Sequence, residues 1–210
     1  MNIFEYLTEI SHAVETVIGE IHHEHELVET LQAELVRLTE ATEEGYKQAE
    51  FLAMNPDLDD DGLGTAIHWD TYFGPDKERY HKAAEIDMAT QKLESHKLST
   101  AALAGSLLQF AKQGISLRYG KERIGCPDGR LIAEMPLHEV IWQGRNQAIH
   151  WEEGEFRRPV ERCFQKLTEE IDPVFGEYVN RSMAYEVVSI LGWKSFDNFA
   201  DDLTRLEENS

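Results

Sequence analysis

Apolar residues recur at intervals of three and four from the start of the chain to about Met54, while the positions between them are rich in Glu. This spacing places the apolar side chains on one face of an α-helix. The pattern predicts either one very long helix over residues 3–54 or two helices with a break near Gly45. The apolar positions are Ile3, Leu7, Ile10, Val14, Val17, Ile21, Val28, Leu31, Leu35 and Leu38.

Residues 55–76 interrupt the helical pattern with the segment NPDLDDDGLGTAIHWDTYFGPD. Its Pro, Gly and Asp content predicts either a long, inserted acidic loop or an inserted lobe. The segment begins like a calcium-binding loop, because Asp57, Asp59, Asp61 and Gly62 fall at positions 1, 3, 5 and 6 of that pattern. The twelfth position, which should be Glu, is His68, so an exposed acidic turn is the favoured interpretation.

Helical periodicity resumes after the loop and continues to the end of the sequence. Ser99 or Thr100 and Ser195 are candidate helix caps, and Pro136 and Pro159 suit the first turn of a helix. The turn-rich segment that follows residue 118 has room for a short hairpin. The expected helices cover residues 77–97, 100–118, 136–152, 159–170, 181–191 and 196–206.

These elements predict an all-α fold, an antiparallel up-and-down helical bundle with a loop insertion after a long N-terminal helix. With 210 residues, of which 41% are hydrophobic, the chain is long enough to bury one substantial core. We expect a single helical domain over residues 1–210, with residues 55–76 as the inserted loop and residues 172–210 as a C-terminal helical extension.

The charge of the chain is strongly acidic but unevenly distributed. Twenty Lys and Arg stand against 40 Asp and Glu, giving a formal net charge of −20. Such a surface repels polyphosphates and argues against broad nucleic-acid binding. Residues 101–170, however, hold 10 basic and 10 acidic residues, which is half of all the basic residues in the chain. Residues 143–153 therefore lie in the least acidic part of the chain.

The sequence predicts a cytoplasmic protein that needs no cofactor. It contains no apolar run of about 18 residues, the length that a membrane helix requires. The first residues, MNIFEYLTEISHAVE, carry acidic groups where a secretory signal carries basic ones. Cys126 and Cys163 form neither a disulfide framework nor a CxxC pattern.

The segment QGRNQAIHWEE, residues 143–153, places Arg145, Asn146 and His150 together in the least acidic part of the chain. The planar, permanently charged side chain of an arginine suits a phosphate group. A histidine can accept and release a proton near neutral pH, and Asn146 can orient either group. These side chains are sufficient to cleave RNA without a metal ion, since the arginine can stabilise the charge that develops on phosphorus.

On a helix, five residues turn through about 500°, which leaves Arg145 and His150 roughly 140° apart. They do not share one stripe, but a two-fold dimer would bring two copies of each group into one cleft. An alternative interpretation of the same residues is an exposed arginine and a histidine hydrogen-bonded to Glu152 or Glu153 on the surface of a helix.

The sequence RNQAIH, residues 145–150, resembles the Arg-x4–6-His signature of the HEPN superfamily, in which a polar residue, often Asn, follows the arginine. HEPN domains are antiparallel helical bundles with this motif on a late helix, and here it follows several predicted helices. The resemblance covers about residues 77–170 and does not extend to the N-terminal half or to residues 55–76.

The resemblance implies a metal-independent endoribonuclease of a toxin–antitoxin, abortive-infection or other antiviral system. Such enzymes act as homodimers and leave a 2′,3′-cyclic phosphate on the cleaved RNA. By motif position, Arg145 and His150 are catalytic and Asn146 supports them. RNA is then the substrate, an antitoxin or another protein is a partner, and no membrane is involved. The candidates to line a basic cleft are Arg118, Lys121, Arg123, Arg157 and Arg158.

Two other hypotheses remain open. The first is a non-catalytic HEPN-like module that binds a nucleotide, RNA or a protein. The second is a metal-binding helical bundle, suggested by the segment IHHEHE and by Glu-x-x-His pairs. The apolar stripe leaves Glu20 and His23 mostly outward, which favours a solvated acidic face. The three Glu-x-x-His pairs are Glu9/His12, Glu20/His23 and Glu78/His81.

The aromatic residues beside the motif have two interpretations. Trp142 and Trp151 could stack on bases. Because both lie on a helix that must pack against something, core or dimer contact is favoured.

Overall fold

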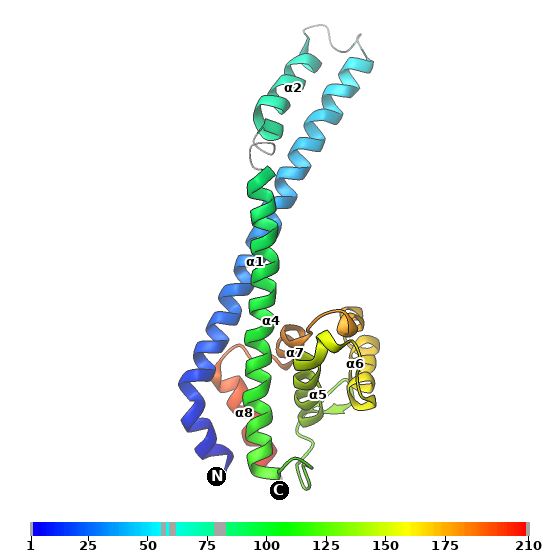
Figure 1. Ribbon diagram of the computed structural model, residues 1–210. Helices are drawn as coiled ribbons and strands as arrows, with labels where there is room; N and C mark the ends of the chain where they lie inside the picture. Colours follow the sequence, from blue (N-terminus) through cyan, green and yellow to red (C-terminus); the bar gives the residue numbers. More distant parts are fainter. Residues whose placement is uncertain (1, 56–57, 59–61, 78–82, 209–210) are drawn as a thin grey trace. The chain divides into compact units, whose positions relative to one another are not determined.

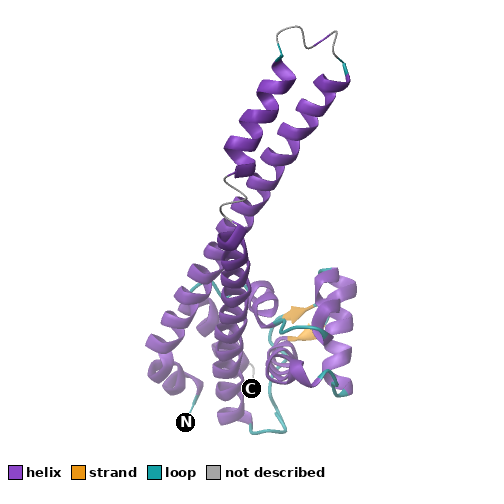
Figure 2. Cartoon of the chain, turned by 45° about the horizontal axis from the view of Figure 1, so that its top comes forward, coloured by secondary structure: helices purple, strands orange, loops and turns teal. Residues whose placement is uncertain are grey.

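The computed structural model describes residues 2–55, 58, 62–77 and 83–208. These residues are mostly helical (Figures 1 and 2), which confirms the all-α class. The chain divides into two compact units. The first unit comprises residues 1–24 and 98–210, and the second comprises residues 25–97.

The first helix, α1, is continuous from Ile3 to Met54 and has no break at Gly45. Gly45 has a packing role instead, because a Cβ atom there would lie 2.2 Å from Oγ1 of Thr71 on α2. The loop expected over residues 55–76 is largely helical, with α2 over Leu63–Thr71 and a π-helix, η2, over Tyr72–Asp76.

The predicted calcium-like segment falls largely outside what the structure shows. Asp57, Asp59 and Asp61 lie outside the described residues. Gly62 precedes α2 with a φ of 70°, in the left-handed region, and has no side chain to cap the helix.

The next helix, α4, runs without interruption from Ala83 to Tyr119, where two helices separated near Ser99 were expected. Ser and Thr act as N-caps when a helix begins immediately after them. Here Thr100 is 4% exposed, and Leu93 and Ala104 are buried on either side of it. Continuous burial along this helix outweighs the capping preference.

A short hairpin follows α4, formed by β1 over Leu131–Ile132 and β2 over Met135–Pro136. The strands are antiparallel, and Ile132 pairs with Met135. The two turn residues, Ala133 and Glu134, have φ angles of 48° and 55°, as a tight hairpin turn requires. The turn-rich connector therefore contains the hairpin for which the sequence has room.

The hairpin leads into α5, Leu137–His150, which carries the predicted motif. A 3₁₀ turn, η3, covers Trp151–Glu153, and α6 follows over Arg158–Glu170 with a proline in its first turn. Figure 1 shows α5 beside α6 and α7 within the first unit. The two helices expected to start near Pro136 and Pro159 are thus present.

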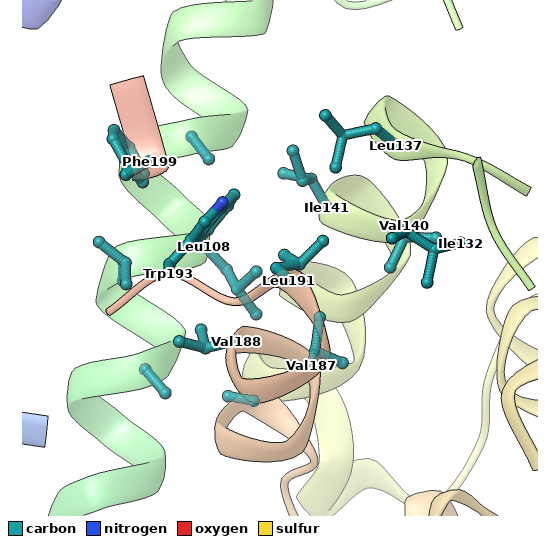
Figure 3. Close-up of a cluster of buried hydrophobic side chains, with 14 of the residues drawn as sticks. Leu108, Ile132, Leu137, Val140, Ile141, Val187, Val188, Leu191, Trp193 and Phe199 are labelled. Carbon is teal, nitrogen blue, oxygen red and sulfur yellow. The ribbon is translucent and has the colours of Figure 1, made fainter. Parts of the chain in front are cut away.

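The C-terminal segment contains a 3₁₀ helix, η4, over Pro173–Val179, then α7 over Ala184–Leu191 and α8 over Phe196–Glu208. Although residues 172–210 were expected to form an extension, they contribute to the core of the first unit. In Figure 3, Val187 and Phe199 of this segment lie in one buried cluster with residues of α4 and α5, and both are fully buried.

A buried polar network joins the hairpin to α7 and α8. Arg130 donates from Nε and Nη2 to the two carboxylate oxygens of Asp202, at 2.8 Å each, and from Nη2 to the carbonyl oxygen of Leu191 at 2.6 Å. The indole Nε1 of Trp193 also donates to Asp202 at 2.8 Å. Because Asp202 is 5% exposed, these donors replace the water that its charge has lost.

A second polar contact ties α5 to the chain before α7. Gln147 is fully buried, and its Nε2 donates to the carbonyl oxygens of Tyr178 and Arg181 at 2.7 Å each. Its Oε1 accepts from the backbone N–H of Met183 at 2.9 Å. The amide nitrogen and the amide oxygen of Gln147 both have backbone partners, so this side chain fixes the segment before α7 against α5.

Substituting Gly129 with alanine is expected to destabilise the protein more than the same change at Gly125. Both glycines have positive φ, 67° and 77°, so each substitution has a backbone cost of about 1–2 kcal/mol. A Cβ atom at Gly129 would also lie 2.8 Å from a side-chain carbon of Leu206 and 3.2 Å from Leu137, whereas at Gly125 it meets nothing within 4 Å. Overpacking adds about 1–3 kcal/mol at Gly129 alone. Urea denaturation compares the two variants, and equal losses would contradict the packing argument.

Candidate functional site

Two of the three motif residues line one pocket. Asn146 and His150 are four residues apart on α5 and therefore lie on the same face of the helix. Both border a pocket of about 470 Å³, together with Gln143 one turn earlier. Arg123 and Arg157, which the sequence suggested as binding residues, lie on its wall as well. The pocket thus combines a histidine, amides and two guanidinium groups with the carboxylates of Glu153 and Glu155.

Arg145 lies on a neighbouring face of α5. Its Nε donates to Oε1 of Gln109 on α4 at 2.6 Å, and its Nη1 donates to Oδ1 of Asn146 at 3.3 Å. Asn146 in turn donates from Nδ2 to Oε1 of Gln143 at 3.4 Å. Asn146 therefore connects the guanidinium of Arg145 to the pocket that contains His150, although the two charged residues do not share one stripe.

His150 is oriented by an acidic neighbour. Its Nδ1 lies 2.7 Å from Oε1 of Glu153 in η3, and its side chain is 47% exposed. A carboxylate oxygen accepts hydrogen bonds, so this contact suits the tautomer that has its hydrogen on Nδ1 and leaves Nε2 as an acceptor. This contact was foreseen for a simple surface histidine, but the same geometry suits a general base, whose ring is fixed in one tautomer.

Two cationic side chains lie over the ring of Trp142. The guanidinium carbon of Arg123 lies 4.5 Å from the ring centroid, and Nζ of Lys112 lies 4.8 Å from it. Both distances are within the range of cation–π attraction. Trp142 is half-buried and also borders the pocket, so it serves as a support for cations at the site, a role that the sequence did not suggest.

The charge of Arg123 is partly neutralised by Glu139. An oxygen of Glu139 lies 3.0 Å from Nη1 of Arg123. Burial raises the pKa of Glu139, but hydrogen bonds from Gln143 and Arg123 outweigh that effect and hold the pKa below its usual value. Glu139 therefore remains ionised and holds Arg123 at the pocket wall.

The remaining basic residues suggested by the sequence divide into two groups. Arg158 borders a neighbouring pocket of about 700 Å³, which shares Gln143 and Pro159 with the first pocket. Arg118 lines neither pocket, because its Nε lies 3.3 Å from a carboxylate oxygen of Glu207 and its guanidinium lies over the ring of Tyr119. Lys121 is exposed in the turn that follows α4.

Two residues of α4 belong to the site although the sequence did not suggest them. Gln109 holds Arg145, and Lys112 lies over Trp142. Both are half-buried. No motif marks them, and Gln109 precedes its partner Arg145 by 36 residues and Lys112 precedes Trp142 by 30, so only the packing of α4 against α5 identifies them.

Neither cysteine suits nucleophilic chemistry. Burial raises the pKa of Cys163 to about 12 and that of Cys126 to about 11. Both thiols are therefore protonated at neutral pH, and the thiol is a poor nucleophile compared with the thiolate.

Of the Glu-x-x-His pairs considered for metal binding, Glu9/His12 and Glu20/His23 are exposed. Glu20 and His23 lie on the solvent side of α1, and the pair Glu78/His81 lies outside the described residues. Among the residues that the structure describes, no three His, Cys, Asp or Glu side chains are grouped so that they could hold a metal ion.

In the described part of the chain, no helix combines the length and the apolar character needed to cross a membrane. Comparison of the chain with models of protein families, with curated proteins and with solved structures finds no match.

Proposed function

We propose that this chain is an endoribonuclease that cleaves RNA without a metal ion, as its resemblance to the HEPN superfamily suggests. One observation carries the proposal. Asn146 and His150 border a single pocket with Arg123 and Arg157, and Asn146 accepts a hydrogen bond from Arg145. A proton acceptor and several cations are therefore gathered at one end of α5, in the part of the chain whose net charge is zero.

In the proposed reaction, Nε2 of His150 accepts the proton of a 2′-hydroxyl group of RNA. The 2′-oxygen attacks the adjacent phosphorus, and the bond from phosphorus to the 5′-oxygen breaks. The 5′-oxygen takes a proton that the protonated His150 returns through water, which leaves a 2′,3′-cyclic phosphate on one fragment, a 5′-hydroxyl on the other and a neutral His150. Arg145 stabilises the extra negative charge on phosphorus in the transition state, and Asn146 positions it.

The pocket also offers support for the rest of an RNA strand. The guanidinium groups of Arg123 and Arg157 suit backbone phosphates. Phe156 is half-buried on the pocket wall and packs against Tyr178 with a centroid distance of 5.5 Å. An aromatic ring fixed in this way is a platform on which an unpaired base can stack.

The proposal includes a homodimer, because Arg145 and His150 lie on different faces of α5 and a two-fold axis would bring the faces of two copies together. It also includes the antiparallel up-and-down bundle of the HEPN fold and a cytoplasmic role in defence or in a toxin–antitoxin pair. An antitoxin or another protein partner would then control the activity.

A second candidate function is a non-catalytic HEPN-like module that binds RNA, a nucleotide or a protein. The observation that favours it is the position of Arg145, whose Nε donates to Gln109 and which does not border the pocket of His150. A module of this kind would bind RNA at the same surface and leave it intact.

The test is incubation of the purified protein with total RNA in EDTA. Cleavage is expected. The 2′,3′-cyclic phosphate at each new 3′ end should block ligation of an adapter until an enzyme with 2′,3′-cyclic phosphatase activity removes it. Intact RNA in the presence of folded, dimeric protein would contradict the ribonuclease and favour the binding module. Fragments with free 3′-hydroxyl ends would contradict attack by the 2′-hydroxyl.

A further inference from the structure

Two half-buried basic residues of the first unit, Lys112 and Arg145, differ in their surroundings from the other half-buried basic residues of that unit. Many of the basic side chains in this unit form ion pairs with carboxylates within 4 Å. These are Arg118, Arg123, Arg130, Lys166 and Arg181. In the part of the chain that the structure describes, neither Lys112 nor Arg145 is paired with a carboxylate, although both are half-buried. In a chain with 40 acidic residues, this absence of counter-charge calls for an explanation.

The two cations lie where α4 packs against α5. The helices approach closely here, since a Cβ atom at Gly105 of α4 would lie 3.6 Å from the Cβ of Ala148 of α5. Gln109 of α4 accepts from Arg145, and Lys112 lies three residues further along α4, on the same face. Trp142 similarly lies three residues before Arg145 on α5, with Nζ of Lys112 4.8 Å from its ring centroid. The two positive groups therefore converge on one region.

This convergence has an electrostatic cost. Burial lowers the pKa of Lys112, and the positive charges of Arg145 and Lys121 lower it further. Burial also lowers the pKa of Arg145. The cation–π contact with the ring of Trp142 offsets part of the free-energy cost of burying the ammonium of Lys112. An aromatic ring carries no net charge, however, and cannot neutralise two cations. A bound anion would supply the missing negative charge.

The donors available at this place fit a phosphate group. Lys112 offers ammonium hydrogens, and Arg145 retains Nη2, since its Nε and Nη1 already donate to Gln109 and Asn146. The amide nitrogen of Gln109 can also donate while its oxygen accepts from Arg145. Charge-assisted donors arranged around one point, with no carboxylate beside them, select an anion with several acceptor oxygens.

We propose that Lys112 binds, together with Arg145 and Gln109, the phosphodiester group of RNA that is cleaved. The inference rests on the proposed ribonuclease function and adds to it a phosphate-binding residue from a different helix. Lys112 then acts in the binding of substrate and in neutralising the charge on phosphorus, and Trp142 holds its side chain in place.

The experiment measures binding of a 2′-O-methyl RNA oligonucleotide, which cannot be cleaved because its 2′-oxygens carry no proton. Fluorescence anisotropy over a range of salt concentrations gives affinity and salt dependence. Lys112→Met retains the aliphatic stem over Trp142 and removes the charge, whereas Lys112→Arg retains the charge. Lys194→Met is the matched control, because Lys194 is an exposed lysine of the same unit.

We expect Lys112→Met to weaken binding about tenfold, as the loss of one charge-assisted hydrogen bond implies. The slope of log affinity against log salt should fall by about 0.7, the value for one phosphate contact on a single strand. Lys112→Arg should restore both, and Lys194→Met should change neither. Equal effects of Lys112→Met and Lys194→Met, or no binding by the unaltered protein, would overturn the assignment. Binding of a mononucleotide but not of the oligonucleotide would overturn the assignment to RNA.

Cleavage of unmodified RNA, measured in parallel, separates this inference from the proposed function. If the oligonucleotide binds in a Lys112-dependent way and no RNA is cleaved, the phosphate site stands and the ribonuclease fails. If RNA is cleaved and Lys112→Met binds and cleaves like the unaltered protein, the ribonuclease stands and the role of Lys112 fails.

Discussion

Replacing His150 with alanine is expected to slow RNA cleavage by about 10²- to 10⁴-fold and to leave the fold intact, because general acid–base catalysis contributes that much to such reactions. The side chain is exposed, and its hydrogen bond is to Glu153, a neighbour on the surface. Little packing is therefore lost. The measurement is the initial rate of cleavage of a labelled oligonucleotide in EDTA, with circular dichroism to verify the helices.

The control for this variant is His12→Ala, which removes another exposed histidine of the same unit. It should cleave like the unaltered protein. A His150→Ala variant that retains full activity would exclude His150 as the general base. A loss of activity in both variants would point to a general effect on solubility or folding.

The proposed sharing of the site between two copies of the chain can be tested with variants of Arg145 and His150. Arg145→Ala is expected to be inactive as well, since it removes the group that stabilises charge on phosphorus. If each site takes Arg145 from one copy and His150 from the other, co-expression of the two variants should restore roughly a quarter of the activity, because half of the dimers are mixed and each has one intact site. No recovery from mixed dimers would place both residues of a site on one copy.

Asp202→Ala is expected to lower the free energy of unfolding by about 3 kcal/mol, because it leaves a charged partner and a buried indole donor without an acceptor. The carboxylate accepts from Arg130 twice and from Trp193 once. Trp193 is 2% exposed, so water cannot replace the lost acceptor without a local rearrangement. Urea denaturation followed by circular dichroism measures the loss.

Asp201 provides the comparison for this change, because it is the preceding residue on α8 and is exposed. Asp201→Ala is expected to change the stability by no more than about 0.5 kcal/mol. If Asp202→Ala were equally mild, the network would be a surface contact without structural importance. In that case α7 and α8 would depend on apolar packing alone.

Several features of the fold follow from local signals in the sequence. Pro159 lies in the first turn of α6, and the side-chain oxygen of Ser195 accepts from the backbone N–H of Asn198 at 3.3 Å, as an N-cap does. Local signals failed where tertiary burial opposes them. Ser99 and Thr100 have good capping chemistry, yet α4 continues through them because Leu93, Thr100 and Ala104 are buried on one face of the helix. A sequence window contains no information on that burial.

For the site, helix geometry alone predicted that Arg145 and His150 would lie on different faces of one helix, and the structure agrees. What could not be predicted is which side chains meet these two faces. Gln109 precedes Arg145 by 36 residues, and its contact depends on how α4 packs against α5. Periodicity identifies a buried face but not the residues of another helix that it meets.

Three of the four residues between Arg145 and His150 contact other parts of this protein, which limits the transfer of the motif to another protein. Asn146 contacts Arg145, Gln147 holds three backbone groups before α7, and Ala148 lies close to Gly105 of α4. A helix carrying these six residues into another scaffold would leave the amide of Gln147 without acceptors. The smallest transferable module is therefore the motif helix with its neighbours, not the hexapeptide.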